Sequence, residues 1–201
     1  LAGMATQAER ASELLRHHGM LRAAELAAHG VRSEVLRRLV ESGQVERVAR
    51  GLYRAPDAVD EHTGLAEAGR RVPGGVVCLL SALQFHNLTT QLPWQVWIAV
   101  GQKAWRPKDE GVPLRLVYMS GRAFAQGVEE HTTAGGVVRV YGVAKTVADC
   151  FKFRNKVTLE VALEALREGW RERRFTTDEL WRQAEVCRVA NVMRPYLESL
   201  P

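Results

Sequence analysis

Six arginines lie between residues 32 and 54, and they give this stretch the clearest binding chemistry in the sequence. A guanidinium group donates hydrogen bonds in a planar fork that matches phosphate oxygens and the edge of guanine. Three glutamates in the same stretch leave a local net charge of +3. We therefore expect this stretch to bind a polyanion. The arginines are Arg32, Arg37, Arg38, Arg47, Arg50 and Arg54.

The spacing of apolar residues places the first of these arginines on a helix. Apolar side chains recur at helical intervals from Val31 to Val40, and Gly43 then ends the helix. Residues 45–49 and 51–54 read as two short strands joined by a tight turn. A helix followed directly by a hairpin is the way a winged helix-turn-helix ends.

Two earlier helices complete this pattern. Residues 6–18 have a helical apolar spacing and stop at Gly19, and residues 22–29 form a second, alanine-rich helix that stops at Gly30. Three short helices and a hairpin are typical of the winged-helix class, whose third helix enters the major groove. We predict that residues 4–56 form a winged helix-turn-helix domain that binds DNA.

Within this domain the third helix and the hairpin have different expected tasks. Arg37 and Arg38 are predicted to reach the groove, and Arg47, Arg50 and Arg54 of the hairpin to hold phosphates. The alternative for the third helix is an ordinary solvated face. The arginines of the hairpin favour DNA binding over this alternative. Three more residues, Arg32, Ser33 and Glu34, share the exposed side of the helix, where Ser33 either caps the helix or lies in its first turn.

A polar link over residues 55–61 is the expected domain boundary. Residues 62–201 are predicted to form an α+β domain, a mixed sheet with helices that ends in a helical segment. Strands are expected at 94–100, 114–119, 128–133 and 137–141, and a short apolar run lies at 76–80. Helices are expected at 62–71, 81–86, 145–153, 159–173, 177–187 and 189–200. Because residues 94–100 and 114–119 are apolar on both faces, both are expected to be central strands.

Basic residues also occur in the second domain, which carries the net charge of +5, since residues 1–61 balance to zero. Three of them, Lys103, Arg106 and Lys108, surround Trp105 in a loop and are expected to extend the DNA-binding surface. Lys152, Arg154 and Lys156 follow a helix end, where cations are also favoured by the helix dipole. The role of this last set stays open.

Catalytic chemistry has little support. Cys150 follows Asp149 but lies between apolar residues, so we expect a buried, inert thiol. The adjacent acids Asp109–Glu110 and Glu129–Glu130 do not form a metal cluster, and no zinc spacing or phosphate-binding glycine loop is present in the sequence. We expect no enzyme activity and no cofactor.

Three widely spaced cysteines fit thiols in a reducing compartment, so a cytoplasmic location is expected. The longest uncharged run is broken by proline and glycine and does not predict a membrane span. No signal peptide is expected, and residues 1–3 ahead of Met4 are expected to remain from a cleaved tag.

Three motifs in order resemble the AbiEi family, the antitoxins of bacterial type IV toxin–antitoxin modules. They are RSEVLRRLVESGQVERVARGLYRA, CLLSALQFHNLTTQLPWQVWIAV and KTVADCFKFRNKVTLEVALEALREGW, and the resemblance runs from about residue 8 to residue 196. It implies a winged helix that binds inverted repeats in the promoter of its own operon and represses it. It also implies a C-terminal domain that carries antitoxicity against a nucleotidyltransferase-like toxin.

The expected partners are therefore double-stranded promoter DNA and the cognate toxin, with no membrane. The chain is expected to be a monomer or weak dimer, and two copies can pair on DNA. The alternative function is a protein-interaction module that neutralises the toxin by direct binding, with the winged helix as a scaffold.

Overall fold

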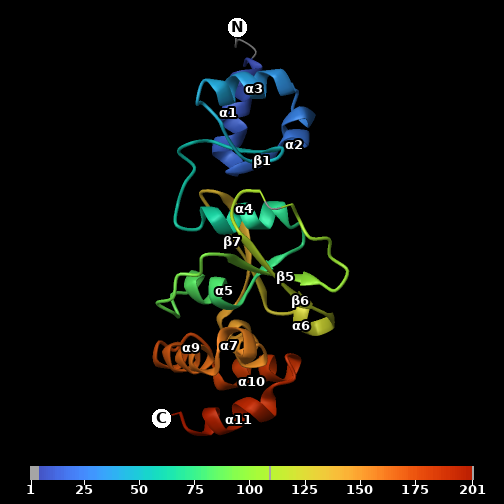
Figure 1. The fold of residues 1–201 in the computed structure, drawn as a ribbon. Coiled ribbons are helices and arrows are strands. Elements are labelled where there is room, and N and C mark those ends of the chain that lie inside the picture. Colours follow the sequence, from blue (N-terminus) through green and yellow to red (C-terminus); the bar gives the residue numbers. More distant parts are fainter. Residues whose placement is uncertain (1–4, 109, 201) are drawn as a thin grey trace. The chain divides into compact units, whose positions relative to one another are not determined.

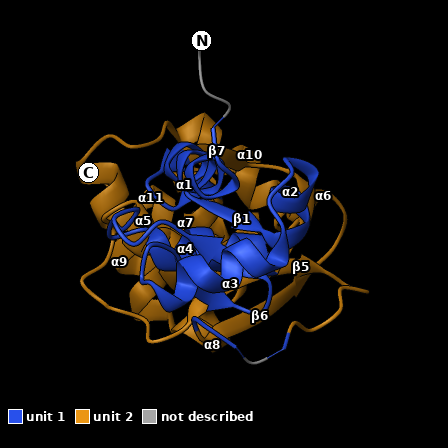
Figure 2. Cartoon of the chain, turned by 90° about the horizontal axis from the view of Figure 1, so that it is seen from above, with its two compact units in different colours: residues 1–71, 108–112, 132–138 blue, residues 72–107, 113–131, 139–201 orange. Residues whose placement is uncertain are grey.

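The computed structural model describes residues 5–108 and 110–200, so Met4, Asp109 and Pro201 lie outside the described residues. The chain forms two compact units (Figure 2). The first comprises Leu1–Arg71, Lys108–Val112 and Thr132–Val138, and the remaining residues form the second. The first unit thus extends beyond residue 56 to include the helix over residues 63–71, which the sequence placed in the second domain.

The first unit has the element order predicted for a winged helix (Figure 1). Three helices and a hairpin are present, and a short strand between the first two helices joins the hairpin in a three-stranded sheet of order β1-β3-β2. The elements are α1 (Gln7–His18), β1 (Met20–Arg22), α2 (Ala23–Ala28), α3 (Ser33–Glu41), β2 (Glu46–Ala49), β3 (Leu52–Arg54) and α4 (Thr63–Arg71).

Local sequence signals set where these elements begin and end. A capping box starts α1, because the Thr6 hydroxyl accepts from the Glu9 amide and the Glu9 carboxylate accepts from the Thr6 amide. The three helices then bury one apolar core that includes Leu15, Leu26 and Leu36. Burial of this stripe fixes which face of α3 remains exposed.

Helix α4 is tied to the first unit by two arginines. Arg70 donates from Nε to the Met20 carbonyl at 3.0 Å, and its Nη1 lies 3.2 Å from Glu25 Oε1. The buried Glu67 carboxylate accepts from the Val112 amide at 2.7 Å and lies 3.7 Å from Arg71 Nη1. These polar contacts explain why α4 and residues 108–112 group with the winged helix.

A side chain at Gly19 is expected to destabilise the fold. It has a φ of +76°, and a Cβ atom there would lie 2.3 Å from the carbonyl carbon of Gly135. Gly43 has a similar φ of +73° but nothing within 4 Å of a Cβ. Gly43→Ala should therefore cost only about 1 kcal/mol of unfolding free energy. Gly19→Ala should cost about 1–3 kcal/mol more, because the backbone must also move. Chemical denaturation checks the difference, and equal losses would contradict it.

The second unit combines a mixed sheet with helices, as predicted. Its five-stranded sheet has the order β6-β5-β4-β8-β7, in which β5–β6 and β4–β8 are parallel and β4–β5 is antiparallel. The strands are β4 (Val76–Val77), β5 (Val96–Gly101), β6 (Leu114–Met119), β7 (Val128–Thr133) and β8 (Gly136–Tyr141). The tip of the β7–β8 hairpin is the part counted with the first unit.

Helices gather on one side of this sheet and end the chain as a helical segment (Figure 1). Their shared core includes Phe151, Leu166, Leu180 and Met193. None of the helices that the structure describes has the length and apolar character needed to cross a bilayer. The helices are α5 (Leu79–Phe85), α6 (Gly121–Ala125), α7 (Val143–Lys152), α8 (Arg154–Val157), α9 (Leu159–Arg171), α10 (Thr177–Val186) and α11 (Ala190–Glu198).

One expectation about the sheet was wrong. Strand β5 is central and buried as predicted, but β6 is an edge strand with two exposed side chains. Arg115 and Tyr118 are three positions apart and therefore lie on opposite faces of β6. The Arg115 guanidinium lies 4.1 Å from the centroid of the Trp97 ring on β5. Each face of β6 therefore carries one exposed side chain, although most of the strand is apolar. The short helices α6 and α8 were not predicted.

Candidate nucleic-acid interface

Helix α3 places its charged residues on the exposed face. Arg32 is the N-cap with an extended backbone, and Ser33 lies in the first turn without capping the helix. Leu36 and Leu39 turn into the core, with 2% and 4% of their surfaces exposed. The opposite side of the helix is solvent-exposed and carries Arg32, Ser33, Glu34, Arg37 and Arg38. The sequence prediction that these side chains share one face agrees with this geometry.

Ion pairs along α3 hold the two central arginines. Arg38 Nη2 lies 3.3 Å from Glu34 Oε1, and Arg37 Nη1 lies 3.1 Å from Glu41 Oε1. All four side chains are 60–68% exposed. Such exposed pairs contribute less than about 1 kcal/mol each, so an incoming phosphate or base can replace the carboxylate at little cost. Glu34 therefore lies between the two arginines and holds them in place at the exposed face of α3.

The hairpin carries its arginines at different positions relative to the sheet. A bulge between Arg47 and Ala49 shifts the register of β2 against β3, and Arg47 lies exposed opposite Tyr53. Arg50 occupies the turn with Gly51, whose φ is +68°. Among residues 5–108 and 110–200, no carboxylate pairs with the guanidinium of Arg47 or Arg50. Both are therefore available to a phosphate.

Arg54 is less available than the other arginines of the hairpin. Its Nε and Nη2 donate to Glu46 Oε2 at 2.8 and 2.6 Å, across the register pair that joins β2 and β3. The Arg54 side chain is only 19% exposed. This half-buried pair braces the hairpin, so a contact from Arg54 to phosphate would have to compete with Glu46.

The turn of the hairpin is held by a segment from far along the sequence. The Arg50 amide donates to Glu110 Oε2 at 2.9 Å, and the Arg71 guanidinium donates to the Lys108 carbonyl at 2.8 Å. Lys108 thus belongs to the same unit as α3 and the hairpin, and it is exposed. The structure therefore brings Lys108 to the predicted DNA-binding unit, together with a carboxylate that the sequence did not place there.

The other predicted basic residues belong to the second unit. Lys103 and Arg106 are exposed in the loop after β5, beside Trp105, whose surface is 91% exposed. A further set lies around α8, where Arg154 donates to the Phe151 carbonyl at 2.8 Å and so caps the end of α7. The other members of that set are Lys152 and Lys156.

A buried polar cluster in the second unit was missed by sequence reasoning. Lys145 Nζ lies 2.5 Å from Asp149 Oδ2 and 3.9 Å from the centroid of the Tyr141 ring. Cys187 Sγ donates to Asp149 Oδ1 at 3.2 Å. Burial raises the pKa of Asp149, although Lys145 opposes the shift. The spacing of Lys145 and Asp149 by four residues on a helix was the available signal.

The cysteines have the inert surroundings that the sequence predicted. Cys78, Cys150 and Cys187 are buried and unbridged. Burial raises the pKa of the Cys187 thiol to about 12 and that of Cys150 still further, so neither forms a thiolate near neutral pH. Within the described residues, no three His, Cys, Asp or Glu side chains gather as ligands for a metal ion.

Comparison with known proteins matches part of the first unit to a family of transcriptional regulators. Residues 9–56 match the model of a family described as "Transcriptional regulator, AbiEi antitoxin". The matched residues run from within α1 to the residues just after β3, so they contain the whole exposed arginine surface. The match confirms the family resemblance seen in the sequence over this part of the chain. No curated protein matches the chain.

Proposed function

We propose, from this match to AbiEi antitoxin regulators, that the chain is a DNA-binding antitoxin of a type IV toxin–antitoxin module. It represses its own operon by binding inverted repeats in the promoter, and it counteracts a nucleotidyltransferase-like toxin. It acts in the cytoplasm, without enzyme activity of its own.

The observation that supports DNA binding most directly is the exposed arginine surface of the first unit. Arg37 and Arg38 project from the winged-helix recognition element, and their carboxylate partners are exposed and weakly held. Arg47 and Arg50 lie on the hairpin that follows in sequence. In winged-helix proteins the helix reads base edges while neighbouring backbone-binding groups fix its register. Arg32, Ser33 and Glu34 contribute at the N-terminal turn of α3.

The second unit has two parts in this proposal, which are an extension of the DNA-binding surface and the antitoxin role. Lys103 and Arg106 extend the DNA footprint from the loop after β5, and Lys108 extends it from the first unit. Trp105 offers an exposed ring beside them, which suits packing against a nucleic-acid backbone. The counteraction of the toxin rests on the family resemblance rather than on a feature of the second unit.

Replacing Arg47 and Arg50 singly with alanine is expected to change the salt dependence of DNA binding. Each lost phosphate contact should reduce the slope of log K against log salt by about 1 and weaken all DNA sequences alike. Arg54→Ala should change the slope less, because its guanidinium is shared with Glu46. Fluorescence anisotropy over a salt series measures this, and an unchanged slope for both hairpin variants would remove the hairpin from the interface.

The alternative function is direct neutralisation of the toxin, with the winged helix as a scaffold. The zero net charge of residues 1–61 and the ion pairs along α3 favour it. The two functions differ in what the purified chain does alone. A shift of promoter DNA by the chain without any partner supports the regulator, whereas stable co-purification with the toxin and no DNA shift supports the scaffold.

A further inference from the structure

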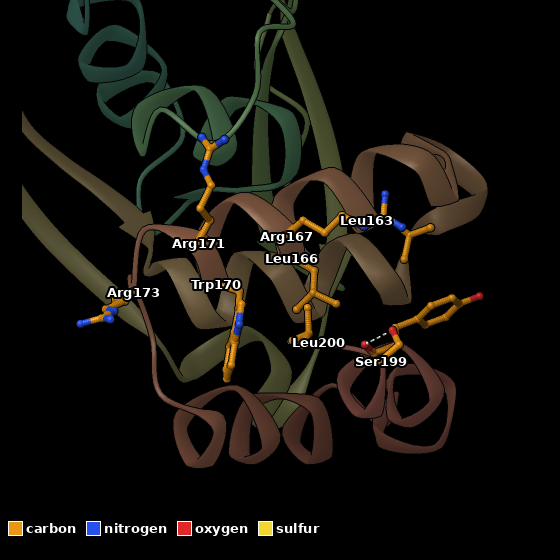
Figure 3. Close-up of a pocket in the computed structure, with 9 residues that line it drawn as sticks. Leu163, Leu166, Arg167, Trp170, Arg171, Arg173, Ser199 and Leu200 are labelled. Atoms are coloured by element: carbon orange, nitrogen blue, oxygen red, sulfur yellow. Dashed lines mark hydrogen bonds between the residues drawn. The ribbon is translucent and has the colours of Figure 1, made fainter.

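An apolar groove lies on the second unit, between the helices α9 and α11. Both helices pack against α7, and the space between them has a volume of about 590 Å³. Figure 3 shows Leu166 and Trp170 reaching from α9 toward the C-terminal residues, where Leu200 lies near Leu166. Leu163 and Tyr196 are only partly buried at the same groove. A groove of this kind, between two helices with an apolar floor, has the shape that takes a further helix.

A stripe of charged residues runs along α9 beside this groove. Glu160, Glu164, Arg167 and Arg171 recur at i, i+4, i+7 and i+11, which places them on one side of the helix. Glu160, Arg167 and Arg171 are exposed and Glu164 is half-buried. Both acids lie in the N-terminal half of the stripe and both arginines in the C-terminal half.

This order of charges is complementary to itself when two copies of α9 meet antiparallel. A two-fold axis near the middle of the helix brings Glu164 of one copy to Arg167 of the second copy, and Glu160 to Arg171. A parallel arrangement would instead set acid against acid. Self-complementarity about a two-fold axis is the requirement for a closed, isologous dimer.

We propose that the groove between α9 and α11 is a self-association surface, occupied by α9 of a second copy of this chain. The helix dipole alone favours acids at the start of a helix and arginines at its end. The dipole does not account for a groove beside that stripe, lined by half-buried Leu163, Trp170 and Tyr196. A second helix covers these side chains and pairs the charges in one step.

The charges that line the groove restrict other occupants. Its lining includes Arg167, Arg171 and Arg173 and no acidic residue. Arg171 is in an ion pair with Glu168 of its own helix, and Glu160 of a second copy would have to replace this exposed, weak partner. Glu164 precedes Arg167 by three residues on the same side of α9. An antiparallel copy places its own Glu164 beside that arginine. A two-fold dimer also has the symmetry of an inverted repeat, which joins this inference to the proposed regulator.

The test is a charge exchange measured by sedimentation velocity on the full chain without DNA. The unaltered chain should show a reversible monomer–dimer equilibrium between about 1 µM and 500 µM. Glu164→Arg sets the introduced guanidinium against Arg167 twice in the dimer, and Arg167→Glu sets two acids together twice. Each variant alone should dissociate at least about 10-fold more readily. An equal mixture of the two variants should dimerise again, because both pairs are then opposite in charge.

Two further measurements keep this result specific. Glu13→Arg and Arg16→Glu, on the exposed side of α1, make the same charge changes away from the groove and should leave the dimer unchanged. A chain that stays monomeric throughout the concentration range overturns the proposal, and so does a mixture that fails to dimerise. A third outcome is that the chain does not self-associate, and that the unaltered chain and Glu164→Arg bind an acidic peptide equally well. This outcome would also overturn the proposal and would assign the groove to a different protein. Because no DNA is present, the outcome is independent of the DNA-binding proposal.

Discussion

Replacing Arg37 and Arg38 together with alanine is expected to weaken binding to promoter DNA by about 100-fold or more. Each arginine is 64–68% exposed on α3 and bound only by weak pairs with Glu34 or Glu41, so neither supports the fold. A bidentate contact from arginine to guanine is worth about 1–3 kcal/mol of discrimination, and two such contacts multiply in the binding constant. Electrophoretic shift of the promoter fragment measures the loss, and circular dichroism checks that the helices remain.

The control for this experiment removes the same charge elsewhere. Arg122 and Arg182 are exposed on α6 and α10, far in sequence from the winged helix, and their double alanine variant loses the same two positive charges. It should bind promoter DNA within a few-fold of the unaltered chain. If both double variants lose affinity equally, binding depends on net charge alone. If neither loses affinity, α3 is not the recognition helix.

Lys145→Met is expected to lower the free energy of unfolding by about 3–5 kcal/mol, the usual effect of leaving one member of a buried ion pair alone. Lys145 and Asp149 are 1% and 0% exposed, so water cannot replace the lost ammonium group. Methionine keeps the length and the apolar stem of the side chain. Urea denaturation, followed by tryptophan fluorescence, measures the loss.

The loss should depend on pH in a defined direction. Burial already raises the pKa of Asp149 in the folded chain, and removal of Lys145 takes away its nearest opposing charge. A carboxyl group whose pKa is higher in the folded state binds more protons there, so stability falls as the pH rises above the ordinary value of about 4. The variant should therefore be least impaired at acid pH and most impaired at neutral pH. A loss that grows toward acid pH would contradict this account.

Two further variants test the origin of the effect. Asp149→Leu added to Lys145→Met removes the stranded carboxylate and should restore much of the lost stability, since an apolar pair can replace a buried ion pair. Arg38→Met breaks the Arg38–Glu34 pair, which has the same spacing of four residues but is exposed, and should cost less than about 1 kcal/mol. Equal losses at the buried and the exposed pair would contradict the role given to burial.

The first unit was predictable from sequence because its signals are local. Gly19 and Gly43 end helices, and the apolar stripe that includes Leu36 and Leu39 orients α3. These patterns depend on residues a few positions apart, which is the range that backbone geometry and side-chain periodicity govern. The exposure of Arg37 and Arg38 followed from the same periodicity.

Features that depend on distant residues were not predictable in this way. Glu110 reaches the hairpin turn from 60 residues away, and Arg71 holds the Lys108 carbonyl across 37 residues. The edge position of β6 depends on which strands pair, and its apolar residues alone do not show that one of its edges is unpaired. Arg54 looked equivalent to its neighbours in sequence, yet the register of β2 against β3 sets it against Glu46.

The first unit is assembled from three separate stretches of the chain. A fragment that stops after the hairpin would expose the Met20 carbonyl and Glu25, which Arg70 now satisfies, and would lack the Glu110 carboxylate that accepts from Arg50. We therefore expect such a fragment to be less stable than the same residues in the intact chain. Measurements on an isolated winged helix would then underestimate the stability that these residues have in the intact chain, and exchanging the winged helix with that of a related protein would need more than one fusion point.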